Sequence, residues 1–172
     1  MEFYIAQGIS IITTIIAVTR LQAKNMKGML VGHITTNVLA GSTYFLLNSF
    51  SGAGISFIAI AQSIAMYIFN RKNIPPPKWL IGFFLMLYIG TSALSFKTIF
   101  DLFPAIAALC FAVSISVQKP LISRLWFIFN PALWVIYDFY AKAYVNAVMH
   151  FIILLSTIVA LVRVDKIFAK KV

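Results

Sequence analysis

The sequence predicts an all-α polytopic membrane protein with seven transmembrane helices. Three observations predict this fold class: the composition, the length of the apolar segments and the distribution of the basic residues. Hydrophobic residues make up 62% of the 172 residues and charged residues only 10%, whereas a soluble domain has about 45–50% apolar and roughly 25% charged residues. This excess of apolar residues indicates that lipid surrounds most of the chain.

Seven apolar segments are long enough to cross a bilayer, whose core needs about 20 residues of helix, with a range of roughly 17–25. The predicted spans are, in order, Phe3–Thr19, Gly28–Leu47, Gly54–Asn70, Trp79–Ser95, Ile99–Val117, Leu121–Phe139 and Ala143–Arg163. Polar, glycine-containing or proline-containing segments separate them, such as LQAKNMKG, RKNIPPPK and QKP, which favour turns. Because no basic region precedes the first apolar segment, we expect a retained span rather than a cleaved signal peptide.

The basic residues predict the orientation of these spans. If the N-terminus is outside, twelve of the fourteen lysines and arginines fall in cytoplasmic segments, and only Lys97 and Lys142 fall outside. Cytoplasmic loops are enriched in lysine and arginine, so this distribution supports seven spans with the N-terminus out and the C-terminus in. The net charge of +10 comes from these separate groups and forms no continuous patch, so nucleic acid is not an expected partner.

An internal repeat divides the spans into three, one and three. An offset of 93 residues places Asn37 on Asn130 and Tyr44 on Tyr137. A single linking span gives the second unit the same orientation as the first, so the units would be parallel repeats, as in transporters that bind solute between their halves. The predicted units are a three-helix bundle at 1–72, a Pro-rich connector with a linking helix at 73–98, and a second three-helix bundle with a basic tail at 99–172.

Polar residues inside the apolar spans are the candidate functional residues, because an unpartnered amide in hydrocarbon costs on the order of a few kcal/mol and therefore faces the bundle or a wet cavity. We predict that a central cavity is surrounded by Asn37, Asn130, Trp134 and Asn146, with His33, Gln62 and His150 as further lining residues. Amides donate and accept hydrogen bonds, and an aromatic face packs on an apolar sugar surface. No charged residue is expected at this cavity to balance an ionic solute, so the set suits a small, neutral, polar solute.

Structural interpretations of the same residues stay open. An asparagine in a membrane helix can join neighbouring helices, at about 0.6–2 kcal/mol, and Trp134 can be a packing residue. For His33 and His150, a neutral hydrogen-bonding role is favoured over proton relay. Asp138 and Lys142 are expected to form an exposed pair near the outer surface, which contributes ~0–1 kcal/mol.

Pro131 is the predicted hinge. Proline has no N–H, so the carbonyl of Phe127 loses its helical partner and the helix kinks or loosens there. A freed carbonyl beside Asn130 would be available to line a cavity.

The sequence indicates no enzyme. The four acids, Glu2, Asp101, Asp138 and Asp165, are all expected near the membrane surfaces, and the chain has no catalytic motif. The single cysteine, Cys110, is expected to be a small core residue, and no metal or cofactor is predicted. With no acid at mid-membrane, ion coupling has no obvious residue, so we expect uncoupled movement of the solute.

The segment NPALWVIY followed by VNA resembles the SWEET and SemiSWEET sugar transporters of the PQ-loop superfamily, through Asn130, Trp134, Tyr137 and Asn146. A closer resemblance is to the YgjV-type family of bacterial inner-membrane proteins, from IAQG at Ile5 to Arg163. AQG, YFLL followed by SGAG, and LWVIYDFYA are its strongest segments. This resemblance implies a multi-pass protein of the bacterial cytoplasmic (inner) membrane.

The combined pattern predicts a transporter or facilitator of a small neutral polar solute, sugar-like, that works by uncoupled alternating access. The alternative is a non-transporting interaction or accessory protein with a SWEET-like fold, and a homo-oligomer is left open. The departures from the SWEET pattern concern the hinge. Pro104 and Pro131 match the SWEET prolines in the second repeat only, Val38 stands at the corresponding position of the first repeat, and the PQ dipeptide is absent.

Overall fold

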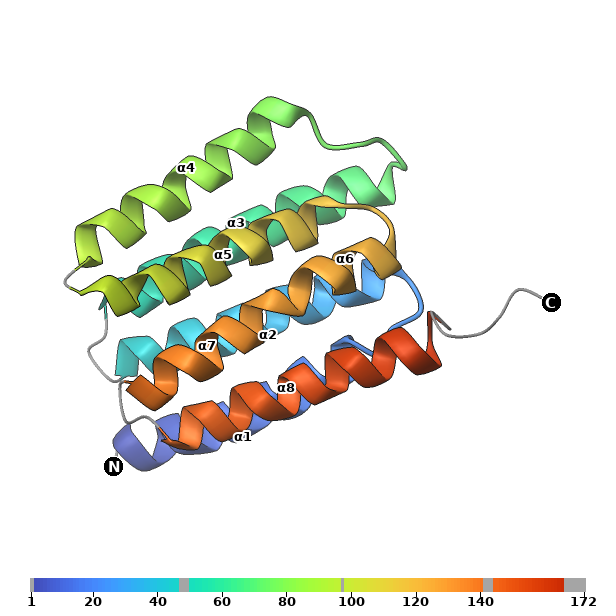
Figure 1. The fold of residues 1–172 in the computed structure, drawn as a ribbon. Helices are drawn as coiled ribbons and strands as arrows, with labels where there is room; N and C mark the ends of the chain where they lie inside the picture. Colours follow the sequence, from blue (N-terminus) through green and yellow to red (C-terminus); the bar gives the residue numbers. More distant parts are fainter. Residues whose placement is uncertain (1, 47–49, 97, 141–143, 166–172) are drawn as a thin grey trace.

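The computed structural model describes residues 2–46, 50–96, 98–140 and 144–165, and these residues form helices and short connections without a strand. The elements are α1 (Glu2–Arg20), α2 (Met26–Leu46), α3 (Phe50–Arg71), α4 (Lys78–Ser95), the 3-10 turn η1 (Ile99–Asp101), α5 (Leu102–Ser116), α6 (Pro120–Phe127), α7 (Phe129–Tyr140) and α8 (Tyr144–Arg163). Because α6 and α7 follow each other along one path (Figure 1), the helices of the described residues form seven rods, one for each predicted span. The predicted all-α class and the seven helices are confirmed.

The sixth rod is interrupted at Ile128, between α6 and α7. Three residues later comes Pro131, which is fully buried. Since proline cannot donate a hydrogen bond to the carbonyl four residues earlier, the ladder is broken beside Phe127. The interruption therefore lies where the sequence places a lost backbone hydrogen bond.

The surface of the bundle is apolar and its interior contains many polar groups. Leu94, Phe57 and Trp79 are 91%, 77% and 72% exposed, while Gln62, Arg124 and Thr157 are 0% exposed. Among the described residues, Ala53–Arg71 and Ile99–Ser116 are long and apolar enough to cross a membrane, and Gly8–Arg20, Lys78–Leu94 and Ala147–Arg163 are shorter apolar helices. Apolar outside and polar inside is the arrangement that a bilayer favours, because polar groups avoid lipid.

The helices form two layers with α4 at one side (Figure 1). One layer contains α1, α2 and α3, and the other contains α8, the α6–α7 rod and α5. Helix α1 packs against α8, α3 packs against α5, and α4 contacts both α3 and α5. The centre of the molecule thus lies between α2 on one side and the α6–α7 rod on the other.

Three connections and the end of α8 gather at one end of the bundle, on the right in Figure 1. This end, called the basic end below, carries Arg20, Lys24, Lys27, Arg71, Lys72, Lys78, Lys119, Arg124 and Arg163.

Two glycines of α2 allow close packing of the first layer. A Cβ built on Gly32 would approach the Cβ of Arg20 in α1 to less than 3.0 Å, and one built on Gly41 would lie 3.3 Å from the Cβ of Ser56 in α3. Small residues let membrane helices approach closely enough for dispersion contacts to hold them together. The first of these contacts also determines where the Arg20 side chain can go.

Candidate functional site

A cavity of about 230 Å³ lies between the two layers, and its lining includes residues from every helix of the bundle. Its polar side chains include Arg20, Thr36, Asn37, Asn130, Trp134 and His150. Pockets for drug-sized ligands have volumes of about 300–1,000 Å³. The cavity therefore suits a smaller solute.

Three of the four predicted binding residues line this cavity together. Asn37 lies near the middle of α2, while Asn130 and Trp134 lie one turn apart in α7. The amide of Asn37 donates to the carbonyl of His33 at 2.8 Å, and that of Asn130 to the carbonyl of Ala107 at 2.9 Å. Since each amide has two N–H groups and an acceptor oxygen, both retain hydrogen-bonding capacity. The fourth residue, Asn146, belongs to α8, but its side chain lies outside the described part of the chain.

His150 also lines the cavity, and its partner there is Asp138, which the sequence suggested would pair with Lys142. Its Nδ1 lies 2.7 Å from Oδ2 of Asp138, and its ring stacks on Trp134 with centroids 5.5 Å apart and planes at 15°. Asp138 is 3% exposed. The expectation of an exposed Asp138 pair is therefore wrong, while Lys142 lies outside the described residues.

The spacing of α7 explains this correction. Asp138 follows Trp134 by four residues, so both project from the same face of the helix, which is turned toward α8 and the cavity. The position of Asp138 near the end of the span suggested exposure, but the face of the helix decides its burial.

His33 and Gln62 lie outside the cavity lining. His33 is completely buried and packs edge-on against Phe111 and Phe127, at centroid distances of 5.2 and 5.6 Å. Gln62 donates to the carbonyl of Ala112 at 3.0 Å and to the hydroxyl of Ser116 at 3.2 Å. His33 thus supports the aromatic wall of the cavity from behind, and Gln62 joins α3 to α5.

Arg20 is the cavity residue that the sequence analysis missed. Its Nη1 donates to the hydroxyl of Thr36, and its Cζ lies 5.4 Å from the ring centroid of Phe127. Its Nε is buried and has no hydrogen-bond partner among the described residues. Its position at the end of a span placed it among the cytoplasmic basic residues, but the side chain runs past Gly32 toward the cavity. Gly32, one turn before Thr36, was the feature of the sequence that could have indicated this path of the Arg20 side chain.

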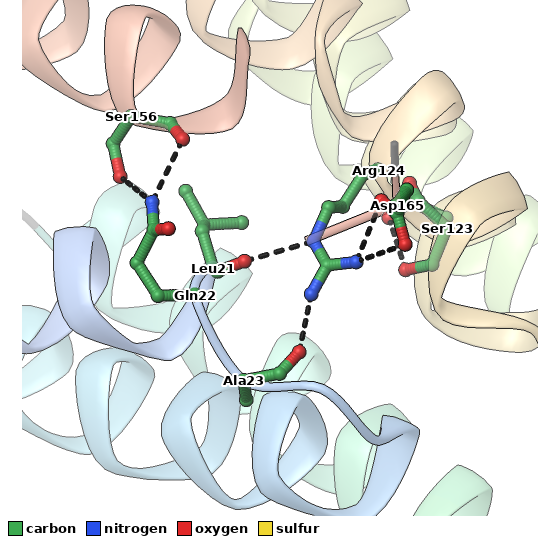
Figure 2. Close-up of polar contacts among 8 residues, drawn as sticks. Leu21, Gln22, Ala23, Ser123, Arg124, Ser156 and Asp165 are labelled. Atoms are coloured by element: carbon green, nitrogen blue, oxygen red, sulfur yellow. Dashed lines mark hydrogen bonds and ion pairs between the residues drawn. The ribbon is translucent and has the colours of Figure 1, made fainter. Parts of the chain in front are cut away.

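A buried arginine, Arg124, joins the two layers at the basic end (Figure 2). Arg124 is 0% exposed, and its Nη1 donates to both carboxylate oxygens of Asp165, at 2.8 and 2.7 Å. The same guanidinium donates to the carbonyl of Leu21 at 2.8 Å and to that of Ala23. The start of the sixth span is thus tied to the α1–α2 connection and to the residues after α8. From the sequence alone, Arg124 is only one of the basic residues of the cytoplasmic segments.

Comparison with known proteins identifies the family of this chain. The family model Imp-YgjV, described as a bacterial inner membrane protein, matches residues 4–167. No curated protein and no solved structure matches the chain. The match begins in α1 and continues past α8, so it includes the cavity and the contacts at the basic end. The chain therefore belongs to the Imp-YgjV family and is a bacterial inner membrane protein.

Proposed function

We propose that this protein is a transporter or facilitator that moves a small polar solute by alternating access through the cavity between its two layers. One observation carries the proposal: Asn37 and Asn130, which the predicted repeat makes equivalent and which lie on different layers, line one cavity together with Trp134. Amides bind hydroxyl, carbonyl and amino groups alike, and an indole provides an apolar contact surface. A site between two halves is the usual arrangement in transporters built from repeats.

Reciprocal contacts support the proposed plan of two parallel three-helix repeats joined by α4. Gln22, after the first helix of the chain, donates to the carbonyl of Ser156 in α8 at 3.0 Å. Gln118, after the first helix of the second unit, donates to the carbonyl of Ile74, beyond the end of α3. Each glutamine thus reaches the third helix of the other unit or the residues that follow it, as two-fold related units would require. The proposed relation to SWEET transporters rests on this plan and on the segment NPALWVIY.

The neutral, sugar-like character expected of the solute rested on the absence of charge near the site. Arg20 lines the cavity, and the buried Asp138–His150 pair borders it. With these charged groups at the cavity, absence of charge no longer supports a neutral solute or uncoupled movement, whereas the amides of Asn37 and Asn130 still support a polar solute. Pro131 stays the proposed hinge, because the break at Ile128 separates the Arg124 contacts from the cavity-lining part of α7.

Solute uptake tests the proposed site. Proteoliposomes with the full chain are offered labelled small metabolites, both neutral and charged, and Asn130→Ala and Trp134→Ala are compared with wild type. We expect wild type to move at least one metabolite and each variant to bind it about 5- to 150-fold more weakly, since a lost hydrogen bond in a dry site costs about 1–3 kcal/mol. Ile136→Ala, on the exposed face of α7, is the matched control. Equal uptake by all variants would place the site elsewhere. A folded wild type that moves nothing would favour the accessory-protein alternative.

The proposed orientation predicts which loops can be labelled from outside. In a Cys110→Ser background, Phe96→Cys should react with an impermeant maleimide on intact spheroplasts, because the α4–α5 connection faces outward. Lys72→Cys, at the basic end, should react only after the membrane is opened. Both positions are exposed. Reaction of Lys72→Cys alone on intact spheroplasts would reverse the orientation.

A further inference from the structure

We propose that the cavity binds a small oxyanion, a carboxylate or a phosphate ester, with the Arg20 guanidinium as its counter-charge. This inference rests on the proposed function of the cavity as a solute site and specifies the class of solute. It replaces the neutral solute expected from the sequence. The observations that carry it are two buried hydrogen-bond donors without partners, the charge balance of the cavity and the order of the groups along it.

The first donor without a partner belongs to Arg20. A guanidinium has five N–H donors in a planar fork. Among the described residues, one hydrogen bond is recorded for it, from Nη1 to Thr36, and the buried Nε has none. A buried charge is normally paired or ligated. The ring of Phe127 provides a cation–π contact, which offsets part of the desolvation cost but does not use the N–H groups.

The second donor without a partner is the hydroxyl of Tyr88. It comes from the linking helix α4, is 1% exposed and lines the same cavity. Its hydroxyl has no hydrogen-bond partner among the described residues. Buried hydroxyls are nearly always hydrogen-bonded, so a solute oxygen is a suitable partner. Two donors without partners at one cavity indicate that the missing group is an acceptor.

The charge balance indicates that this acceptor is anionic. Within the described residues, Arg124 pairs with the carboxylate of Asp165, and His150 contacts that of Asp138. Neither carboxylate contacts Arg20, so the guanidinium of Arg20 is a positive charge at the cavity without an anionic partner among the described residues. A neutral sugar would leave that charge buried and unpaired, whereas a carboxylate or phosphate matches the guanidinium fork with two parallel hydrogen bonds.

The order of groups along the sixth rod defines how such a solute would lie. Phe127, beneath Arg20, and Trp134 are seven residues apart, which is about 10 Å along a helix. The acidic group would therefore lie toward the basic end, against Arg20. The uncharged part would lie beside Trp134 and the amides of Asn37 and Asn130. A small organic acid or phosphate ester has both parts and fits within the cavity volume of about 230 Å³.

Matched pairs of charged and neutral probes test the proposal. Thermal unfolding of the purified full chain is measured with lactate against lactamide, and with glycerol 3-phosphate against glycerol. We expect a saturable rise in midpoint with at least one charged probe and none with its neutral partner, because only the charged probe compensates Arg20. The two pairs distinguish a carboxylate from a phosphate site.

Three variants assign the effect to the cavity. Arg20→Gln should weaken binding of the charged probe about 10- to 100-fold, as expected for loss of a charge-assisted hydrogen bond. Tyr88→Phe, which keeps the ring, should weaken it less and serves if Arg20→Gln does not fold. Arg71→Gln removes one positive charge from an exposed position at the same end and should bind like wild type.

Several outcomes would overturn the proposal: equal binding of charged and neutral probes, no shift with either charged probe, or wild-type binding in both cavity variants. Flux measured in liposomes with the same probes separates this inference from the proposed function. Binding of a charged probe without flux would reject transport but support the anion site. Flux of a neutral probe that does not depend on Arg20 would support transport and reject the anion site.

Discussion

Arg124→Leu is expected to destabilise the protein by about 3–5 kcal/mol, the cost of breaking a buried ion pair by removing one partner. The substitution removes four hydrogen bonds at once and leaves Asp165, which is 10% exposed, without its cation. The carbonyls of Leu21 and Ala23 lose their partner as well. Because the same guanidinium joins the sixth span to the α1–α2 connection and to the chain after α8, the loss affects the packing between the layers.

The measurement is the unfolding midpoint in detergent, followed by tryptophan fluorescence. Arg163→Leu is the matched control, since it removes an arginine from an exposed position near the same end of α8, and it should change stability by less than about 1 kcal/mol. Asp165→Asn should destabilise the protein less than Arg124→Leu, because the guanidinium still donates to the carbonyls of Leu21 and Ala23. If Arg124→Leu were no more harmful than Arg163→Leu, the interlayer contacts of Arg124 would contribute little.

His150→Leu is expected to produce the second large effect, again about 3–5 kcal/mol, because it leaves the buried carboxylate of Asp138 without a partner. The imidazole lies 2.7 Å from that carboxylate and stacks on Trp134. Asp138→Leu should also destabilise the protein, by leaving the imidazole without its acceptor. In the double variant no unpaired charge remains, and apolar replacements of buried ion pairs are often neutral. We therefore expect the double variant to be more stable than His150→Leu.

A double-mutant cycle of unfolding midpoints measures this coupling, which for groups in direct contact is about 0.5–3 kcal/mol. Phe151→Leu, at an exposed position of the same helix, controls for a change in α8 itself. Strictly additive costs would mean that the two side chains do not stabilise each other, and the close contact would then have no energetic role.

Much of the fold followed from local properties of the sequence. The lengths of the apolar segments predicted seven helices, and each predicted span corresponds to one rod. The missing N–H of Pro131 indicated where the sixth rod would be interrupted. Helical spacing placed Asn130 and Trp134 on one face, and both line the cavity with Asn37. These features were predictable because they depend on residues close together in the chain.

The remaining features depend on which helices face each other, and only the tertiary structure decided them. Asp138 meets His150 because α7 packs against α8, and Gln62 meets Ala112 because α3 packs against α5. Periodicity identifies the face of a helix but not the helix opposite it.

The length of some side chains is the second reason why the sequence alone did not place these residues. Arg20 and Arg124 both belong to basic segments at one end of the bundle, which the sequence predicted to face the cytoplasm. In the structure, Arg20 turns past Gly32 into the cavity, and Arg124 turns into the layer contact. An arginine side chain is long enough to place its charge in either environment. The sequence determined where these two charges enter the fold, and the space and acceptors offered by neighbouring helices decided where each guanidinium lies.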